Sequence, residues 1–523
     1  MKHRDLIEGV PGQEKSRRNV ILLTVCIALM AVIASVSGLN VAQPKLAIAF
    51  YASQNAVLWM INSYTICLAA LLLPFGALAD RIGRRRVLLS GLIIFCLASA
   101  TSGLASSTFV MILARIFSGI GAALIMPVTL AVITSTFPKD ERSKAIGIWT
   151  GVAGGGGILG MYLSAVLVDF TDWRWLFILP VVLAIVSIIL TIIVIPESRK
   201  KTASKFDIVG SLLSIIAVIG IVFTLQEFPV KGWGNSTILF SLITGISATV
   251  GFFFWELHQE DPILDMRLFR KRGLASGSVS LLVLFGVQAG IFVVLFPYCQ
   301  GVLGWSGLRS TLGMMPMALF MMISSGLAPK LIKKIGSRHT MAAGVLMGCA
   351  GTLMMAAFVS VDNGYLSILP GMLAMGMGMG LTMTPSTEAI TSSLSESLQG
   401  VASALNDVTR ELGTALGVAL LGSLVTSGYT KAIYNRLDMV PLKIAAEAGK
   451  GLANALAVVP QNTSQSAILI RIAREAFVFG WQQAMWTGAV VMAILFIYIL
   501  KYGPPNLIAA DDTEVSSQSN TLD

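Results

Sequence analysis

The sequence predicts an all-α membrane protein that crosses the bilayer many times, and two observations carry this prediction. Hydrophobic residues make up 55% of the 523-residue chain and charged residues only 12%, about half the ~25% charged fraction of soluble proteins. The hydrophobic residues also come in runs of about 20, long enough for a helix to cross a ~30 Å hydrocarbon layer, unlike the ~10-residue alternating segments of outer-membrane barrels. A soluble enzyme and a porin are both excluded.

Charged clusters and Pro, Gly or Asn turns divide the chain into fourteen predicted spans. They cover residues 19–40, 57–79, 87–105, 109–135, 144–168, 174–196, 207–227, 235–255, 274–300, 308–330, 339–360, 364–388, 400–427 and 477–500. The loop GALADRIGRRR (76–86) after the second span and the loop PKLIKKIGSR (329–338) after the tenth share an Ile-Gly pair in register. This echo predicts two repeated six-helix halves with the seventh and eighth spans inserted between them, an organisation found in many secondary transporters.

The predicted domain organisation follows from these spans. It comprises a cytoplasmic N-terminus (1–18), an N-terminal half (19–200), two inserted helices with a cytoplasmic linker (201–272), a C-terminal half (273–500) and a disordered cytoplasmic tail (501–523). The outer stretch 428–476 of the C-terminal half is much longer than the other connections. We expect it to form either a small extracytoplasmic flap of one or two helices or a hairpin, or a plain spacer.

Basic residues outnumber acidic ones by 37 to 27, and their positions indicate the orientation of the chain. With the N-terminus inside, the inner loops collect basic clusters, whereas the short outer loops hold only Lys45, Arg174, Lys231 and Arg309. This asymmetry places both termini in the cytoplasm. It accounts for the positive net charge without a nucleic-acid partner and predicts an attraction to the anionic lipids of the bilayer.

The first cytoplasmic loop combines glycines, an acid and arginines at fixed spacing. Gly76 and Gly83 permit close helix approach and a sharp reversal, and Asp80 offers a carboxylate at a helix end. Arg84 and the arginines beside it hold the loop at the anionic inner leaflet. In the simpler alternative, the basic residues only set the membrane topology.

A few charged residues fall inside the predicted spans. Arg115 lies in the fourth span, where an arginine costs at least ~2.5 kcal/mol on insertion scales unless it is paired or hydrated. A functional role is therefore expected, the alternative being a structural hydrogen bond to backbone carbonyls of a neighbouring helix.

The remaining carboxylates in or near the membrane interior come late in the chain. They are Glu388, Asp407 and Glu411, with Arg410 between the last two. Asp407 lies about 10 Å along the helix from Gly400, at 1.5 Å per residue, and is the acid most clearly inside a span. Because a low-dielectric medium disfavours its charged form, Asp407 is the predicted main site of proton coupling. A static ion pair with Arg410, which shares its helix face, is the alternative.

These motifs resemble the major facilitator superfamily. GALADRIGRRR is similar to its cytoplasmic loop signature, and LARIFSGIGAA (113–123) to its arginine-bearing fourth-helix motif. The fourteen-span count, TPSTEAI (384–390) and ALNDVTRELGTALG (404–417) resemble its drug:proton antiporter branch, which includes quaternary-ammonium exporters. The resemblance implies that Asp80, with Gly76, Gly83 and Arg84, latches the two halves in the outward-facing state. It also implies that Arg115 serves proton coupling or conformational gating.

The sequence departs from that branch at two places. In the fifth span, Gly156 and Gly160 of the antiporter-like motif remain, but Met161 stands where the family shows proline, so close helix packing is retained without a kink. The aspartates that quaternary-ammonium exporters carry early in the first two spans are replaced by Ser35 and Asn62. Without that negative charge the site has no electrostatic preference for dications, which favours neutral, anionic or lipid-like substrates.

The substrate cavity is expected to involve polar and adaptable side chains of both halves. The candidates are Ser35, Asn62, Tyr64, Gln288, Met375 and Met379. Thioethers adapt to several lipophilic shapes, although the methionines could equally be packing residues.

An enzyme or a sensor is the rival from another class. The three histidines (His3, His258 and His339) lie in or beside loops, and no CxxC, HExxH, GxSxG or P-loop pattern occurs, so neither metal catalysis nor ATP hydrolysis has residues to carry it. A sensor would require a large soluble domain. We expect neither a cofactor nor a metal.

The sequence thus predicts a monomeric, proton-coupled multidrug exporter of the bacterial inner membrane, which moves small lipophilic or amphipathic compounds by alternating access. Export or flipping of an endogenous lipid or metabolite is the alternative.

Overall fold

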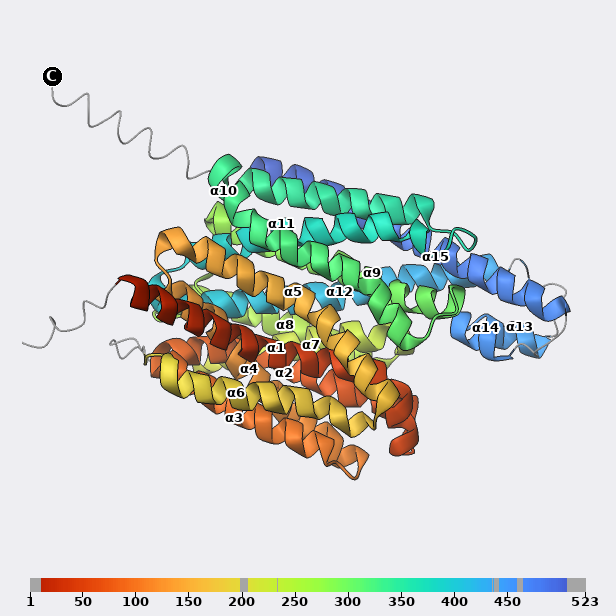
Figure 1. Ribbon diagram of the computed structural model, residues 1–523, viewed down its shortest axis with the longest axis horizontal. Coiled ribbons are helices and arrows are strands. Elements are labelled where there is room, and N and C mark those ends of the chain that lie inside the picture. Colours follow the sequence, from red (N-terminus) through yellow and green to blue (C-terminus); the bar gives the residue numbers. More distant parts are fainter. Residues whose placement is uncertain are drawn as a thin grey trace, which may run out of the picture. The chain divides into compact units, whose positions relative to one another are not determined.

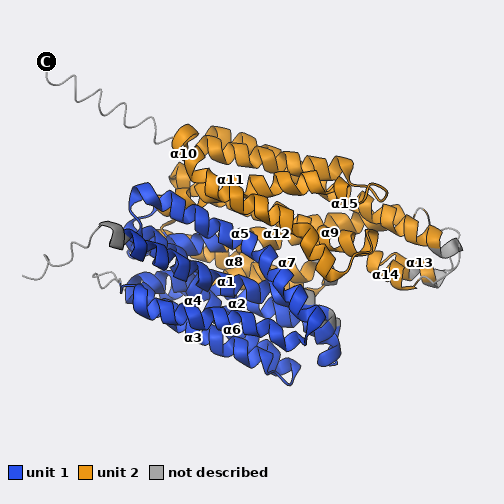
Figure 2. Ribbon diagram, in the orientation of Figure 1, with its two compact units in different colours: residues 1–212, 258–264, 394–407 blue, residues 213–257, 265–393, 408–523 orange. Residues whose placement is uncertain are grey.

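A computed structural model describes residues 11–197, 206–232, 234–434, 436, 442–458 and 464–505. Every regular element within these ranges is a helix (Figure 1). The all-α fold class predicted from the hydrophobic runs is therefore confirmed. By their contacts, residues 1–212, 258–264 and 394–407 form a first compact unit, and residues 213–257, 265–393 and 408–523 form a second (Figure 2).

The first unit contains the first six spanning helices. These are α1 (Pro11–Ala49), α2 (Gln54–Ile82), α3 (Arg84–Gly103), α4 (Thr108–Thr136), α5 (Lys139–Phe170) and α6 (Ile178–Val194), with the short 3₁₀ helix η1 (Trp173–Phe177) before α6. Local sequence sets the starts of several of them. The hydroxyl groups of Ser53 and Ser107 accept hydrogen bonds from the first-turn N–H groups of α2 and α4, and Asp172 caps η1 in the same way.

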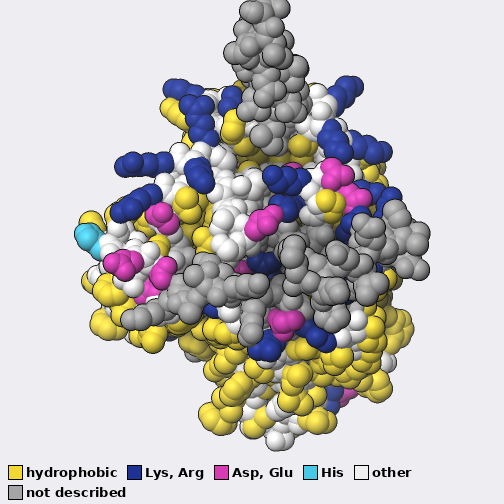
Figure 3. All heavy atoms as spheres, turned by 90° about the vertical axis from the view of Figure 1, so that its left-hand side faces the viewer, with side chains coloured by type: hydrophobic (Ala, Val, Ile, Leu, Met, Phe, Trp, Pro, Cys, Tyr) yellow, Lys and Arg dark blue, Asp and Glu magenta, His cyan; other side chains and the backbone are white. Residues whose placement is uncertain are grey.

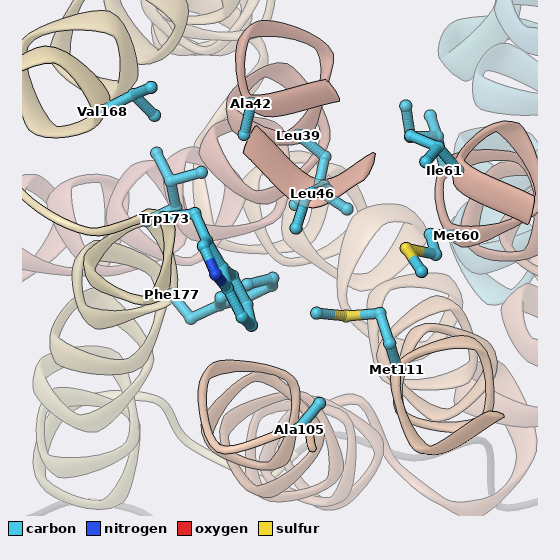
Figure 4. Packing of buried hydrophobic residues seen from close by; sticks show 12 residues of the cluster. Leu39, Ala42, Leu46, Met60, Ile61, Ala105, Met111, Val168, Trp173 and Phe177 are labelled. Carbon is cyan, nitrogen blue, oxygen red and sulfur yellow. The ribbon is translucent and has the colours of Figure 1, made fainter. Parts of the chain in front are cut away.

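A hydrophobic cluster joins the ends of several helices in the first unit. Trp173 and Phe177 of η1 pack there with Leu46 of α1, Met60 of α2 and Met111 of α4 (Figure 4). The two rings meet edge to face with their centroids 6.3 Å apart. The cluster fixes α1, α2 and α4 next to one another, one turn away from Arg115 on α4.

The second unit contains most of the later helices. They are α7 (Ile208–Lys231), α8 (Ser236–His258), α9 (Arg272–Pro297), α10 (Gly307–Phe358), α11 (Leu369–Ser393), α12 (Gln399–Tyr434), α13 (Leu442–Ala448), α14 (Leu452–Val458) and α15 (Ser464–Tyr502), with the short helices η2 (Met266–Arg270), η3 (Tyr298–Val302) and η4 (Gly364–Ser367) between them. The short helix η5 (Glu396–Leu398) precedes α12. α7 begins in the first unit. η5 and the first nine residues of α12 also belong to the first unit, so α12 is one helix shared by both.

Twelve helices in the described part of the chain are long and apolar enough to cross a membrane. α10 has 52 residues and bends at Gly336, whose φ of 83° and ψ of 161° are not helical. The predicted spans 308–330 and 339–360 lie on either side of this bend. α11, predicted as the span 364–388, is not among the twelve, because its many Gly, Thr and Ser residues lower its hydropathy. The count of fourteen stays a prediction.

Helix ends near the membrane surface differ from the predicted ones. α15 begins at Ser464 instead of 477, and α12 continues to Tyr434 instead of 427. The predicted boundary was set at charges that the helix accommodates, since Arg471 and Glu475 pair at 3.0 Å one turn apart on α15. The stretch between these helices contains the two short helices α13 and α14. Most of the predicted tail (506–523) and residues 1–10 lie outside the described residues.

Basic side chains gather on the face where α1 begins. The face at the end where α1 begins shows many Lys and Arg side chains with fewer acidic ones among them (Figure 3). Several of these acids pair with arginines, for example Glu141 with Arg18 and Glu197 with Arg86, each at 3.3 Å. A cationic face of this kind suits the anionic inner leaflet of a membrane.

Candidate functional site

The turn between α2 and α3 places Asp80 at the start of another helix. α2 ends at Ile82 and α3 begins at Arg84, so Gly83 alone makes the reversal, with a φ of 111° that side-chain-bearing residues rarely adopt. Asp80, 6% exposed, accepts hydrogen bonds through Oδ2 from the backbone N–H groups of Gly400 at 2.8 Å and Val401 at 3.2 Å. The carboxylate thereby satisfies first-turn donors of α12 and meets the positive end of its dipole.

Arg84 completes this arrangement from the next turn of the chain. Its Nη2 donates to Asp80 Oδ1 at 3.0 Å and to the carbonyl oxygen of Glu396 at 3.1 Å. Gly76 brings α2 close to α12, because a Cβ there would lie 2.5 Å from the carbonyl oxygen of Gly400. The structure therefore brings Asp80, Gly76, Gly83 and Arg84 together within the first unit. We call this group, with Gly400 and Val401, the Asp80 cluster.

The other three arginines of this loop, Arg81, Arg85 and Arg86, have contacts elsewhere. Arg81 stacks on the ring of Phe206, and Arg85 Nη2 donates to the carbonyl oxygen of Ile192 at 2.6 Å. Arg86, mostly exposed, pairs with Glu197. Arg84 is the arginine of this loop that hydrogen-bonds to the carboxylate of Asp80 through both Nε and Nη2.

Arg115 is fully buried between α1, α2 and α4 of the first unit. Its Nη1 donates to Ser35 Oγ at 2.8 Å, and its Nε to the carbonyl oxygen of Met60 at 3.3 Å. The guanidinium carbon lies 4.2 Å from the centre of the Tyr64 ring. The backbone contact is of the kind that the structural alternative expected. Ser35 and Tyr64, both cavity candidates, are direct partners of Arg115.

The glycines of the fifth span pack against the first helix. A Cβ on Gly156 would lie 2.9 Å from Met30 Sδ, and one on Gly160 would lie 3.1 Å from Ala34 Cα. Both contacts join α5 to α1, and the second involves Ala34, the residue directly before Ser35. The small-residue spacing thus does permit close packing here.

The late charged residues have different surroundings. Asp407 is fully buried and accepts a hydrogen bond from Asn406 Nδ2 through Oδ1 at 3.2 Å. In the second unit, the guanidinium of Arg410 lies 4.5 Å from the centre of the Phe285 ring. Glu388 on α11 and Glu411 on α12 are partly buried.

The other cavity candidates are distributed over several helices. Asn62 on α2 is partly exposed, and Gln288 on α9 is buried. Met375 and Met379 on α11 are fully buried, and the Met375 backbone nitrogen lies 2.8 Å from where a Cβ on Gly351 would sit. Their part in a cavity stays a prediction.

Several residues that contact these groups could not be recognised from the sequence. Gly400, Val401, Glu396 and Met60 contribute backbone atoms, which leave no side-chain pattern. Phe285 was missed because it lies far from Arg410 in sequence.

Comparison with known proteins agrees with this fold. Stp of Mycobacterium tuberculosis (strain CDC 1551 / Oshkosh), named a multidrug resistance protein, is 29% identical over 481 residues, 90% of this chain and 89% of Stp. The methyl viologen resistance protein SmvA of Salmonella typhimurium (strain LT2) is 28% identical over 484 residues, 92% of this chain and 97% of SmvA.

Similarity to solved structures supports the fold alone. The structure of the MFS proton:xylose symporter XylE with 6-bromo-6-deoxy-D-glucose gives a TM-score of 0.58 at 15% identity, over 94% of this chain and 97% of that one. The sequence profile of the Major Facilitator Superfamily matches residues 25–418, well over half of the chain. The resemblance seen in the motifs is thereby confirmed, and this protein belongs to the Major Facilitator Superfamily.

Proposed function

We propose that this protein is a proton-coupled exporter of small lipophilic or amphipathic compounds, a multidrug efflux transporter of the bacterial inner membrane. The observation that carries the proposal is membership of the Major Facilitator Superfamily, together with similarity to proteins that are named for drug resistance. The similarity extends over nearly the whole length of these relatives. The cationic face in Figure 3 supports an orientation with both termini in the cytoplasm. A monomer without cofactor or catalytic activity suffices for this role.

The Asp80 cluster supports alternating access. Asp80 on α2 binds the first turn of α12, a helix that continues into the second unit. Hydrogen bonds from a helix N-terminus to a carboxylate can break and reform as whole helices move, so this contact is suited to act as a conformational latch. It favours the state in which the cytoplasmic ends of α2 and α12 are together.

Asp407 supports proton coupling. It is a carboxylate without any exposed surface in a spanning helix, and it accepts a hydrogen bond from the neutral amide of Asn406. A buried carboxylate gains or loses its proton when its surroundings change, and coupling follows when substrate and proton compete for it. Glu388, Glu411 and Arg410 are the further candidates for this step. Arg115 has neutral partners, so its role in coupling rests on the family resemblance alone.

Efflux in a defined host tests the proposed function. The full chain is produced in a bacterial host that lacks its own efflux pumps, and drug susceptibility and dye efflux are measured with and without a collapsed proton gradient. Export that disappears with the gradient supports the proposal. Equal dye retention with and without the protein contradicts it.

Export or flipping of an endogenous amphipath is the second candidate. The observation that favours it is the pair Ser35 and Arg115, because a neutral side chain occupies the position expected to attract cationic drugs. Release of labelled lipids or metabolites in the absence of any drug would distinguish it from drug export.

A further inference from the structure

The side chain of Arg115 has no acidic partner. Its partners are a serine hydroxyl, a backbone carbonyl and a tyrosine ring, and it forms no ion pair with any residue that the structure describes. The exposed fraction of Arg115 is zero. A full positive charge is thus held inside a spanning helix by neutral groups only, an arrangement that is costly without an anion.

Two polar groups on the same face of α4 also lack hydrogen bonds. Within the described parts of the chain, Arg115 Nη2 has no acceptor and the hydroxyl of Ser118 has no partner, although both are buried. Ser118 follows Arg115 by three residues, so the two groups project from adjacent turns. Buried polar groups are nearly always hydrogen-bonded, and an unsatisfied charged one is the most costly.

We propose that Arg115, with Ser35 and Ser118, binds the carboxylate group of an amphipathic substrate. This inference rests on the proposed export function and specifies its substrate class. The guanidinium fork pairs with carboxylate oxygens through parallel charge-assisted hydrogen bonds. Nη2 and the Ser118 hydroxyl supply two donors for two oxygens, whereas a phosphate group would leave oxygens without donors. The ring of Tyr64 covers one face of the guanidinium and leaves its edge for the carboxylate.

Arg115 has no exposed surface in this structure, so binding requires a conformation in which the guanidinium is open to the substrate. The carboxylate of the substrate then supplies the negative charge that the neighbours of Arg115 lack. Binding neutralises the arginine in a medium of low dielectric, where the attraction is far stronger than in water. The apolar part of the substrate meets the apolar surfaces of the same helices.

Ser35 provides a sharp test because its hydroxyl lies 2.8 Å from Arg115 Nη1. Ser35→Asp places a carboxylate of the protein beside the guanidinium and occupies the site from within. Ser35→Asn is the matched control, since it has the same size as aspartate but no charge. Ser118→Ala removes one proposed donor and keeps the neutral partners of Arg115.

The experiment measures ligand binding by the purified full-length protein in phosphatidylcholine nanodiscs. Octanoate, octanamide and octyltrimethylammonium share one alkyl chain and differ in headgroup charge, and their apparent Kd values come from the ligand-dependent rise in Tm. We expect octanoate to bind the wild type at least about tenfold more tightly than octanamide, a difference of about 1.4 kcal/mol. Ser35→Asn alters a partner of Arg115 and should bind octanoate more weakly than the wild type, but it should still prefer octanoate to octanamide because it adds no negative charge. Ser35→Asp should lose this preference, and Ser118→Ala should weaken octanoate binding severalfold while octanamide binding is unchanged.

Two results would overturn the assignment. One is equal affinity of the wild type for octanoate and octanamide, and the other is an octanoate affinity that Ser35→Asp leaves unchanged. If Ser35→Asp does not fold, the assignment is tested by the affinities of the wild type for octanoate and octanamide and by the octanoate affinity of Ser118→Ala. The binding assay needs no proton gradient, so it can fail independently of the efflux assay. If the wild type exports dye but shows no preference for octanoate over octanamide, the carboxylate site is rejected and the export function is not. Octanoate binding without any gradient-driven efflux rejects the export function alone.

Discussion

Asp80 and Gly400 lie 320 residues apart in the chain, yet the carboxylate of one accepts the backbone N–H of the other at 2.8 Å. The contact needs three local features at once. Gly83 turns the chain directly after α2, Gly76 lets α2 approach closely, and α12 begins with unsatisfied N–H groups. Removing any one of them should weaken the contact.

Asp80→Asn should lower transport at least about tenfold while membrane abundance stays near normal. The amide keeps the shape of the side chain but loses the charge that holds Arg84 and the α12 N-terminus, and a loss of about 1.4 kcal/mol already gives a factor of ten. Efflux in vesicles and immunoblots of the membrane fraction measure the two effects. Arg86→Gln, at a mostly exposed ion pair, is the control and should behave like wild type. A parallel loss of protein and activity would show that Asp80 is needed for folding instead.

Gly76→Ala should impair both transport and stability. The new Cβ would lie 2.5 Å from the carbonyl oxygen of Gly400 and 2.6 Å from Ala404 Cβ, so α2 and the start of α12 must move apart. Overpacking of this kind costs about 1–3 kcal/mol. Gly326→Ala on α10 is the control, because nothing lies within 4 Å of its Cβ position and alanine favours a helix. A Tm of Gly76→Ala equal to that of Gly326→Ala would contradict the close approach.

Resistance to divalent quaternary ammonium compounds should be weak. Ser35 and Asn62 carry no charge, and Ser35 lies beside the cationic Arg115, which repels a dication. Minimum inhibitory concentrations for methyl viologen in an efflux-deficient host, with and without this protein, measure the effect. Since the relative SmvA is named for methyl viologen resistance, the outcome separates the two proteins. Robust export of a dication that survives Glu388→Gln and Asp407→Asn would refute the argument.

Asp407→Asn should abolish gradient-driven accumulation and spare substrate binding or downhill exchange. The amide cannot take up and release a proton, whereas Asp407→Glu can and should retain part of the activity. Everted vesicles with an imposed pH difference measure accumulation, and exchange without a gradient is the internal control. If Asp407→Asn vesicles still concentrate substrate, coupling depends on Glu388 or Glu411 instead.

The fold class and the main groups of the candidate site could be predicted because they depend on local pattern. Runs of apolar residues determine the helices, and the spacing of Gly76, Asp80 and Gly83 determines where the carboxylate lies on its helix. The charged residues Arg115 and Asp407 stand out because charges are rare in spans.

The partners of these groups could not be predicted in the same way. These partners are the backbone N–H groups of Gly400 and Val401 and the backbone carbonyl of Met60. Nearly every residue type has such backbone groups, so no residue type in the sequence marks them. For a related reason, the pattern does not show that α15 begins at Ser464, ahead of the predicted span 477–500. Its charges are paired along one helix face, and a hydropathy pattern does not register pairing.

Gly83 and Gly336 occupy equivalent places in the two repeated loops, and both have positive φ angles, 111° and 83°. The backbone turn is therefore preserved in the repeat, but its chemistry is not. Three residues before Gly83 stands the buried Asp80, whereas three residues before Gly336 stands the exposed Lys333. An ammonium group cannot accept N–H bonds and is repelled by the positive end of a helix dipole. The proposed latch therefore belongs to the first loop of the pair, and the second loop keeps the turn without the carboxylate.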